Sequence, residues 1–204
     1  MSVIKLKIGI MGGTFDPIHI GHLVTAEAVR SEYGLDRVIF IPAANPPHKQ
    51  GLRVTPAMHR YIMTLMATYS NPYFFVSDIE LERPGLSYAF DTVTRLIDKF
   101  GAQTEFYFIT GADAIQDLPT WENVHELLNL CHFIAAARPG SNSSLDAVID
   151  YFGPQGSRRI HRLATPELEI SSTDIRDRVK NGLSIKYIVP ESVESYIAKE
   201  GLYC

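Results

Sequence analysis

The chain has 204 residues, of which 46% are hydrophobic and 21% are charged, close to the averages for globular proteins. This length fits one domain that buries a core without disulfides, and the composition excludes a disordered or fibrous protein. A formal net charge of −4 argues against a general nucleic-acid or membrane surface, so an anionic ligand should be small and locally held.

The cysteine content and the N-terminal residues indicate in which cellular compartment the protein is expected. The two cysteines, Cys131 and Cys204, are too few for a disulfide framework or a spaced metal site. The opening MSVIKLKIGI is expected not to be a signal peptide, because Gly-Gly and Asp-Pro soon follow it. No apolar run approaches the ~20 residues of a membrane span. We therefore expect a cytoplasmic protein with no nucleic-acid or membrane partner, and leave a homo-oligomer open.

Apolar runs that predict strands alternate with segments of helical periodicity. Strands are expected at Val3–Met11, Arg37–Ile41, Tyr73–Val76, Glu105–Thr110 and His132–Ala136. Helices are expected at Ile20–Tyr33, Thr55–Ser70, Tyr88–Phe100, Trp121–Leu130, Leu145–Tyr151, Thr173–Lys180 and Glu191–Lys199. Surface loops are expected at Arg138–Ser144 and Gly153–Ser157.

This alternation predicts an α/β fold with a mainly parallel central sheet and helices on both faces. We expect a single Rossmann-like, doubly wound domain over residues 1–204, with a C-terminal helical part, about residues 171–204, packed on it.

The segment Gly12–His22, GGTFDPIHIGH, joins the first predicted strand to the first predicted helix. In an open parallel sheet, ligands bind beyond the carboxyl ends of the strands. Gly12 and Gly13 let the backbone turn sharply, and their N–H groups with the helix start predict an anion site. The glycine spacing differs from the dinucleotide fingerprint G-x-G-x-x-G, and no Walker A lysine followed by Ser or Thr is present.

His19 and His22 are three residues apart and therefore share one face of the helix start. With ordinary pKa values near ~6.5, both imidazoles can offer donors to phosphate at neutral pH. For H-x-x-H alone, two surface histidines near a cap are the commoner interpretation. A zinc pair usually has i, i+4 spacing, and no third ligand is evident. The glycines, including Gly21 between the histidines, favour the phosphate site.

A second segment suited to phosphate is Ile170–Arg176, ISSTDIR. Its hydroxyls stand at an expected helix start, and the Arg176 guanidinium follows one turn later, in a combination that suits phosphate oxygens. In isolation, S-S-T-D is simply a helix N-cap.

Together the two segments resemble the G-x-F-D-x-x-H-x-G-H and S-S-T-x-I-R signatures of the nucleotidyltransferase superfamily. Over nearly the whole chain, the sequence resembles bacterial nicotinate-nucleotide adenylyltransferases. The resemblance implies transfer of AMP from ATP to nicotinate mononucleotide in NAD biosynthesis, with Mg²⁺ on the triphosphate. It implies catalytic roles for His19, His22 and Arg176. It also implies ATP contacts from Gly12, Gly13, Thr14, Phe15, His22, Gly111, Asp113, Ser172, Thr173 and Arg176.

The same resemblance implies a site for the mononucleotide. Its residues are Asn45, His48, Lys49, Ser87, Tyr88, Thr92, Trp121 and Arg138. From the residues alone, NPPHK is a Pro-rich turn, SYAFDTV is a helix start, and a single Trp is more often in the core. We expect no dedicated metal site; Asp16 is the main candidate to assist Mg²⁺, although Asp-Pro at a turn often only shapes the loop.

Related enzymes and a non-enzyme remain as alternatives. Pantetheine-phosphate adenylyltransferases and glycerol- or choline-phosphate cytidylyltransferases share the first motif, so only the NPPHK, SYAFDTV and LPTW segments separate this chain from them. Class I aminoacyl-tRNA synthetases share HIGH, but this chain is short and has no K-M-S-K-S loop. A nucleotide-binding regulatory module without turnover is disfavoured because both phosphate-suited segments occur together.

Overall fold

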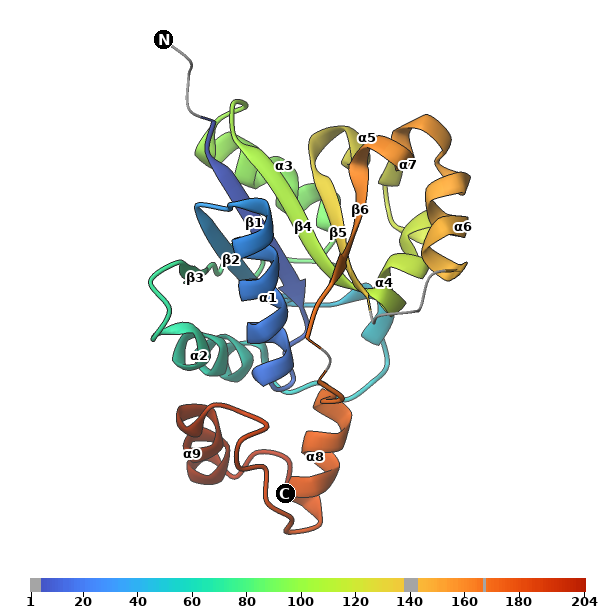
Figure 1. Ribbon diagram of the computed structural model, residues 1–204. Coiled ribbons are helices and arrows are strands. Elements are labelled where there is room, and N and C mark those ends of the chain that lie inside the picture. The colour runs from blue at the N-terminus through green and yellow to red at the C-terminus, as the bar shows by residue number, and fades with distance from the viewer. Residues whose placement is uncertain (1–4, 138–142, 167) are drawn as a thin grey trace.

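The computed structural model describes residues 5–137, 143–166 and 168–204. Its sheet has the strand order β3-β2-β1-β4-β5-β6, and every neighbouring pair is parallel (Figure 1). The strands are β1 Lys7–Gly13, β2 Arg37–Pro42, β3 Phe74–Val76, β4 Glu105–Gly111, β5 His132–Ala137 and β6 Ile160–Ala164. The order reverses between β1 and β4, which confirms the predicted doubly wound α/β class.

Nine helices occur in the described part of the chain. They are α1 Ile20–Tyr33, α2 Ala57–Thr68, α3 Ala89–Phe100, α4 Ala112–Gln116, α5 Val124–Leu130, α6 Ser143–Tyr151, α7 Gly153–Arg159, α8 Ser172–Lys180 and α9 Glu191–Glu200. Two single 3₁₀ turns, η1 Pro47–Lys49 and η2 Leu118–Thr120, complete the regular structure.

Sequence periodicity missed β6, α4 and α7, all of which are short. Gly153–Ser157 was wrongly predicted as a loop, because Pro154 at the start of α7 fits the first turn of a helix. The helix predicted from Trp121 starts only at Val124, since η2 precedes it and Asn123 has a positive φ of 52°. Of the predicted loop Arg138–Ser144, the last two residues begin α6, and residues 138–142 lie outside the described part.

Side chains from successive strand residues enter two different cores, one on each face of the sheet. Phe106 and Phe108 of β4 pack with α3, α5 and α6, whereas Tyr107 and Ile109 pack with α1 and α2. This division follows from the period of two in a strand. Both faces are buried, so the strands are nearly continuous apolar runs.

The C-terminal helices extend the second core. Ile175 of α8 and Val193 and Ile197 of α9 are buried together with residues of α1 and α2. Figure 1 shows α8 and α9 beyond the carboxyl ends of the strands, on the side where ligands of such sheets bind. Among the described helices, none is long and apolar enough to span a membrane.

A histidine pair lies on β5 and β6, within the half of the sheet farthest from β3. His132 Nδ1 is 2.9 Å from His161 Nε2, and the Arg159 guanidinium lies 3.0 Å from His132 Nε2. Because a guanidinium only donates, the His132 proton is on Nδ1 and is donated to His161. Burial, then Arg159 and His161, lowers the pKa of His132 to about 4.

The lowered pKa makes stability depend on pH. In the unfolded chain His132 takes up a proton at its ordinary pKa of ~6.5. In the folded protein it does so only at a pKa of about 4. Because the unfolded chain therefore binds more protons between these pH values, acidification through this window should reduce the free energy of unfolding. His132→Phe retains a ring but removes the titratable group. The free energy of unfolding of this variant should therefore fall less steeply than that of wild type as the pH is lowered through this window. Urea denaturation at both ends of the window measures this.

Exposed His125 is the control, and His125→Phe should retain the wild-type decline. If the free energy of unfolding fell equally with pH in wild type and in His132→Phe, His132 would not be the source of the pH dependence.

Candidate functional site

A cavity of about 520 Å³ lies at the carboxyl ends of β1, β2 and β4, where the strand order reverses. It is lined by β1 residues Gly12 and Gly13, by η1, by the start of α3 and by Trp121. Its volume is within the ordinary range for small-molecule sites. A Cβ on Gly13 would lie 2.9 Å from the Phe15 ring, so this position requires glycine.

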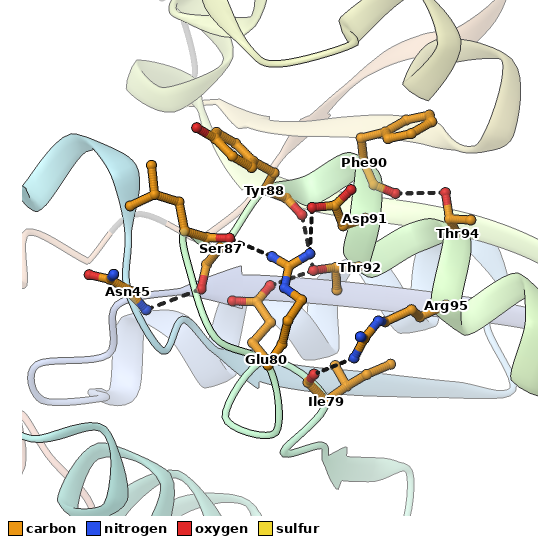
Figure 2. A network of polar contacts seen from close by, with 12 residues as sticks. Asn45, Ile79, Glu80, Ser87, Tyr88, Phe90, Asp91, Thr92, Thr94 and Arg95 are labelled. Carbon is orange, nitrogen blue, oxygen red and sulfur yellow. Dashed lines mark hydrogen bonds and ion pairs between the residues drawn. The ribbon is translucent and has the colours of Figure 1, made fainter.

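One wall of the cavity is a network that joins the loop after β2 to the start of α3 (Figure 2). The Asn45 N–H donates to the Ser87 hydroxyl over 3.1 Å, and the Ser87 N–H donates to the Asn45 carbonyl over 3.0 Å. Figure 2 shows the Glu80 carboxylate between Ser87 and Thr92, and the Thr92 hydroxyl donates to it over 2.6 Å. The wall is therefore held by paired groups from three segments.

Glu80 is the buried acid of this wall. Burial raises its pKa, while hydrogen bonds from Thr92, Ser87 and the Ala44 N–H act in the opposite direction. Arg83 lies nearby, paired with Asp91 and donating to the Leu86 carbonyl over 2.6 Å. The carboxyl thus orients the Thr92 hydroxyl through Oε1, while its Oε2 is buried without a hydrogen-bond partner among the described residues.

Trp121 belongs both to the core and to the cavity. Its ring meets Phe108 and Phe133 edge to face, with centroids 5.6 Å and 6.0 Å apart. It also lines the cavity, so the core and ligand-stacking interpretations are compatible.

Buried His19 and half-buried His22 form a stacked pair at the start of α1. Their rings stack with centroids 3.7 Å apart, and the edge of His22 meets Phe15 at 5.0 Å. The His19 N–H donates to His22 Nδ1 over 3.2 Å, so the helix start itself orients His22. A Cβ on Gly21 would lie 3.1 Å from His19 Nδ1, which shows that this glycine provides the space for the ring.

Both imidazoles are neutral at pH 7, in contrast to the ordinary pKa expected from the sequence. Burial lowers the pKa of His19 to about 4, and burial together with His19 lowers the pKa of His22 well below its usual value. Because His22 Nδ1 accepts a hydrogen bond, its single proton lies on Nε2. His22 therefore remains a hydrogen-bond donor without a positive charge.

The loop Thr14–Pro17, between β1 and α1, is held by side chains from distant segments. Ser172 donates to the Pro17 carbonyl over 2.9 Å, and Arg176 donates to the Asp16 carbonyl over 2.7 Å. These two bonds bring the two sequence motifs together. A second guanidinium contact, in which Arg176 donates to the Thr173 hydroxyl over 3.1 Å, orients the start of α8.

Arg60 of α2 holds the same loop from the other side and is only 1% exposed. It donates to the carbonyls of Thr14 at 2.6 Å, Thr55 at 2.7 Å and Ala44 at 3.3 Å. Hydrogen bonds to charged groups contribute roughly 1.5–3 kcal/mol each, so three of them can offset much of the cost of burying this charge. Burial lowers the pKa of Arg60, and Asp16 acts against that shift.

Asp16 has structural partners on both carboxylate oxygens. Tyr203 donates to Oδ1 over 2.8 Å and the Thr55 N–H donates to Oδ2 over 3.2 Å. These contacts support the loop-shaping interpretation of Asp-Pro.

The structure brings the predicted residues into two adjacent groups. Those that line the cavity are Gly12, Gly13, Thr14, His48, Ser87, Tyr88, Thr92 and Trp121. Those that gather around the loop Thr14–Pro17 and the start of α1 are Phe15, His19, His22, Ser172, Thr173 and Arg176.

Other predicted residues lie elsewhere. Asn45 and Lys49 do not line the cavity, although both flank it, Asn45 through Ser87 and Lys49 in η1 next to His48. Gly111 ends β4 without lining the cavity. The Asp113 side chain and the whole of Arg138 fall outside what the structure describes.

Sequence reasoning missed Arg60, Glu80 and Tyr203. Arg60 and Glu80 are charged residues within otherwise ordinary polar-apolar patterns, and their burial depends on partners far along the chain. Tyr203 lies 187 residues from Asp16. No local signal marks these contacts.

Comparison with known proteins gives a consistent picture. A family model described as Cytidylyltransferase-like matches residues 10–178. A protein from Thermoanaerobacter sp. (strain X514), named probable nicotinate-nucleotide adenylyltransferase, is 53% identical over 200 residues, covering 98% of this chain and 95% of that protein. A protein of the same name from Moorella thermoacetica is 55% identical over 198 residues, covering 97% of this chain and 91% of that protein.

A solved structure supports the fold. Plasmodium falciparum nicotinic acid mononucleotide adenylyltransferase complexed with NaAD has a TM-score of 0.79 at 21% identity, with 97% of each chain covered.

The space that Gly21 leaves for His19 can be tested. In Gly21→Ala, the added Cβ should push the His19 ring outward by a few tenths of an ångström and loosen its packing, so the pKa of His19 should rise above about 4. NMR titration of the imidazole protons measures the change. Ser31→Ala, an exposed substitution on the same helix, should leave this pKa unchanged. An unaltered His19 titration in Gly21→Ala would refute the steric argument.

Proposed function

Because the chain belongs to the nicotinate-nucleotide adenylyltransferases, within the cytidylyltransferase-like family, we propose that it transfers AMP from ATP to nicotinate mononucleotide. The products are nicotinate adenine dinucleotide and pyrophosphate, in NAD biosynthesis. One observation carries the proposal: the stacked His19–His22 pair and the Ser172–Arg176 helix start meet at one loop, beside a cavity of nucleotide size. The low cysteine content agrees with a cytoplasmic location.

In this reaction the phosphate of the mononucleotide attacks the α-phosphorus of ATP in line, and pyrophosphate leaves. Both substrates are anionic, so positioning and charge neutralisation should supply most of the acceleration. The attacking phosphate is itself the nucleophile, and no side-chain nucleophile is needed.

His19 and His22 are proposed to stabilise the charge that develops on the α- and β-phosphates. The neutral imidazole of His22 donates from Nε2, because its Nδ1 accepts the His19 N–H. An approaching triphosphate would favour protonation of His19, whose Nδ1 has no hydrogen-bond partner among the described residues. The lowered pKa of His19 in the free protein therefore leaves this ring able to take up a proton as negative charge enters. The N–H groups of Gly12 and Gly13, with the Thr14, Ser172, Thr173 and Arg176 side chains, would bind the triphosphate.

The cavity is proposed to hold the mononucleotide. The Trp121 ring stands at its wall and suits stacking on the pyridine ring, and the start of α3 at Tyr88 offers free N–H groups to the pyridine carboxylate. His48 and Lys49 of η1, with Arg138, would hold the attacking phosphate.

Mg²⁺ is proposed to enter as part of the MgATP substrate. The described residues include no group of three or more His, Cys, Asp or Glu side chains suited to a metal ion. The Asp16 oxygens already accept hydrogen bonds from Tyr203 and Thr55. This environment fits an ion held by phosphate oxygens and water, as Mg²⁺ commonly is.

Pyrophosphate release with ATP and each of nicotinate mononucleotide, nicotinamide mononucleotide and phosphopantetheine tests the proposal. We expect the highest kcat/KM with nicotinate mononucleotide. Turnover only with phosphopantetheine would reject the substrate assignment, and tight ATP binding with no turnover would favour a regulatory module.

His22→Ala should lower kcat far more than it weakens ATP binding. An electrostatic donor that acts mainly on the transition state contributes roughly 3–4 kcal/mol, or about 10²–10³-fold in kcat. Steady-state kinetics and ATP titration separate the two effects. The control His125→Ala removes an exposed imidazole and should keep wild-type kcat. A loss of ATP affinity with unchanged saturating turnover would refute the transition-state role.

A further inference from the structure

The end of the chain returns to the loop that precedes the histidine pair. After α9, Gly201 and Tyr203 both adopt positive φ angles, 61° and 69°. Gly201 does so easily, whereas a bulky residue such as Tyr203 adopts this conformation only when its surroundings impose it. The result is that the Tyr203 hydroxyl reaches Asp16, 187 residues earlier in the chain, and donates to Oδ1 over 2.8 Å.

Asp16 depends on this contact. Its side chain is 6% exposed, and the Thr55 N–H serves the other carboxylate oxygen over 3.2 Å. Buried carboxylate oxygens are costly to leave without a donor. Burial and Asp16 raise the pKa of Tyr203, so its hydroxyl remains protonated and can donate throughout the neutral range.

Asp16 is next to Phe15, which has the same unusual backbone conformation, with φ 48°. The Phe15 ring fills the space beside Gly13 and meets the His22 ring at right angles, with centroids 5.0 Å apart. The contacts therefore run from Tyr203 to Asp16, along one peptide to Phe15, and from there to His22.

We propose that Tyr203 is a positioning residue for nucleotidyl transfer, acting through Asp16 and Phe15 to hold His22 in its reactive orientation. This inference rests on the proposed function. It assigns the tail after α9 a task in the site, in addition to its packing with the second core.

Tyr203→Phe removes only the hydroxyl and tests the proposal. Its loss should lower kcat about tenfold, with KM for both substrates within about twofold, because the substrate contacts persist while His22 moves. The matched control is Tyr196→Phe, which removes a hydroxyl from α9 that lies 2.8 Å from His59 Nδ1, away from the loop. This control should retain wild-type kcat even where its melting temperature falls as far as that of Tyr203→Phe.

Two further measurements distinguish positioning from general stability. In Tyr203→Phe the His22 imidazole should titrate at higher pH, closer to ~6.5, since the packing of Phe15 against it loosens. Asp16→Asn combined with Tyr203→Phe should reduce kcat no further than the more damaging single substitution.

Wild-type kcat in Tyr203→Phe, equal losses in Tyr196→Phe, or strictly additive losses in the double variant would each overturn the proposal. If the wild-type protein itself makes no dinucleotide, the proposed function fails. The His22 titration then still decides whether Tyr203 positions that ring.

Discussion

The site depends on hydrogen bonds to the backbone carbonyls of one short loop, Thr14–Pro17. Thr14 is bound by Arg60, Asp16 by Arg176 and Pro17 by Ser172, and these donors come from α2 and α8. A loop with Phe15 at φ 48° would not keep that conformation without such partners. This loop leads directly into α1, and its first residue, Thr14, also lines the cavity.

Burial of the histidine pair links stability to chemistry. Burial lowers the pKa of both rings, and the neighbouring His19 lowers that of His22 further, so the free protein holds both rings without charge. The free protein thus avoids two adjacent positive charges, while a polyanionic substrate can supply the partner that makes protonation of His19 favourable. The glycine at position 21 permits the close packing that this arrangement needs.

Local patterns predicted the long elements well because each has its own periodicity. α1 begins and ends where Ile20–Tyr33 was predicted, with Gly34 in the left-handed conformation at its end. Short elements failed, as α7 and β6 did, because five to seven residues carry too little periodicity to outweigh glycine and proline. The pKa values failed for a related reason: burial is a property of neighbours, and the sequence of His19–His22 does not contain them.

By itself, the sequence determined the α/β class, the alternation of strands and helices that gives a parallel sheet, and the two segments whose residue types suit phosphate. These are local properties of spacing and composition. Only the tertiary structure decided that Arg60 and Tyr203 hold the loop, that Glu80 orients the cavity wall, and that both histidines are neutral. Hydrogen bonds between groups 46 or 187 residues apart, and the desolvation that lowers a pKa, exist only once the folded chain has brought distant segments together.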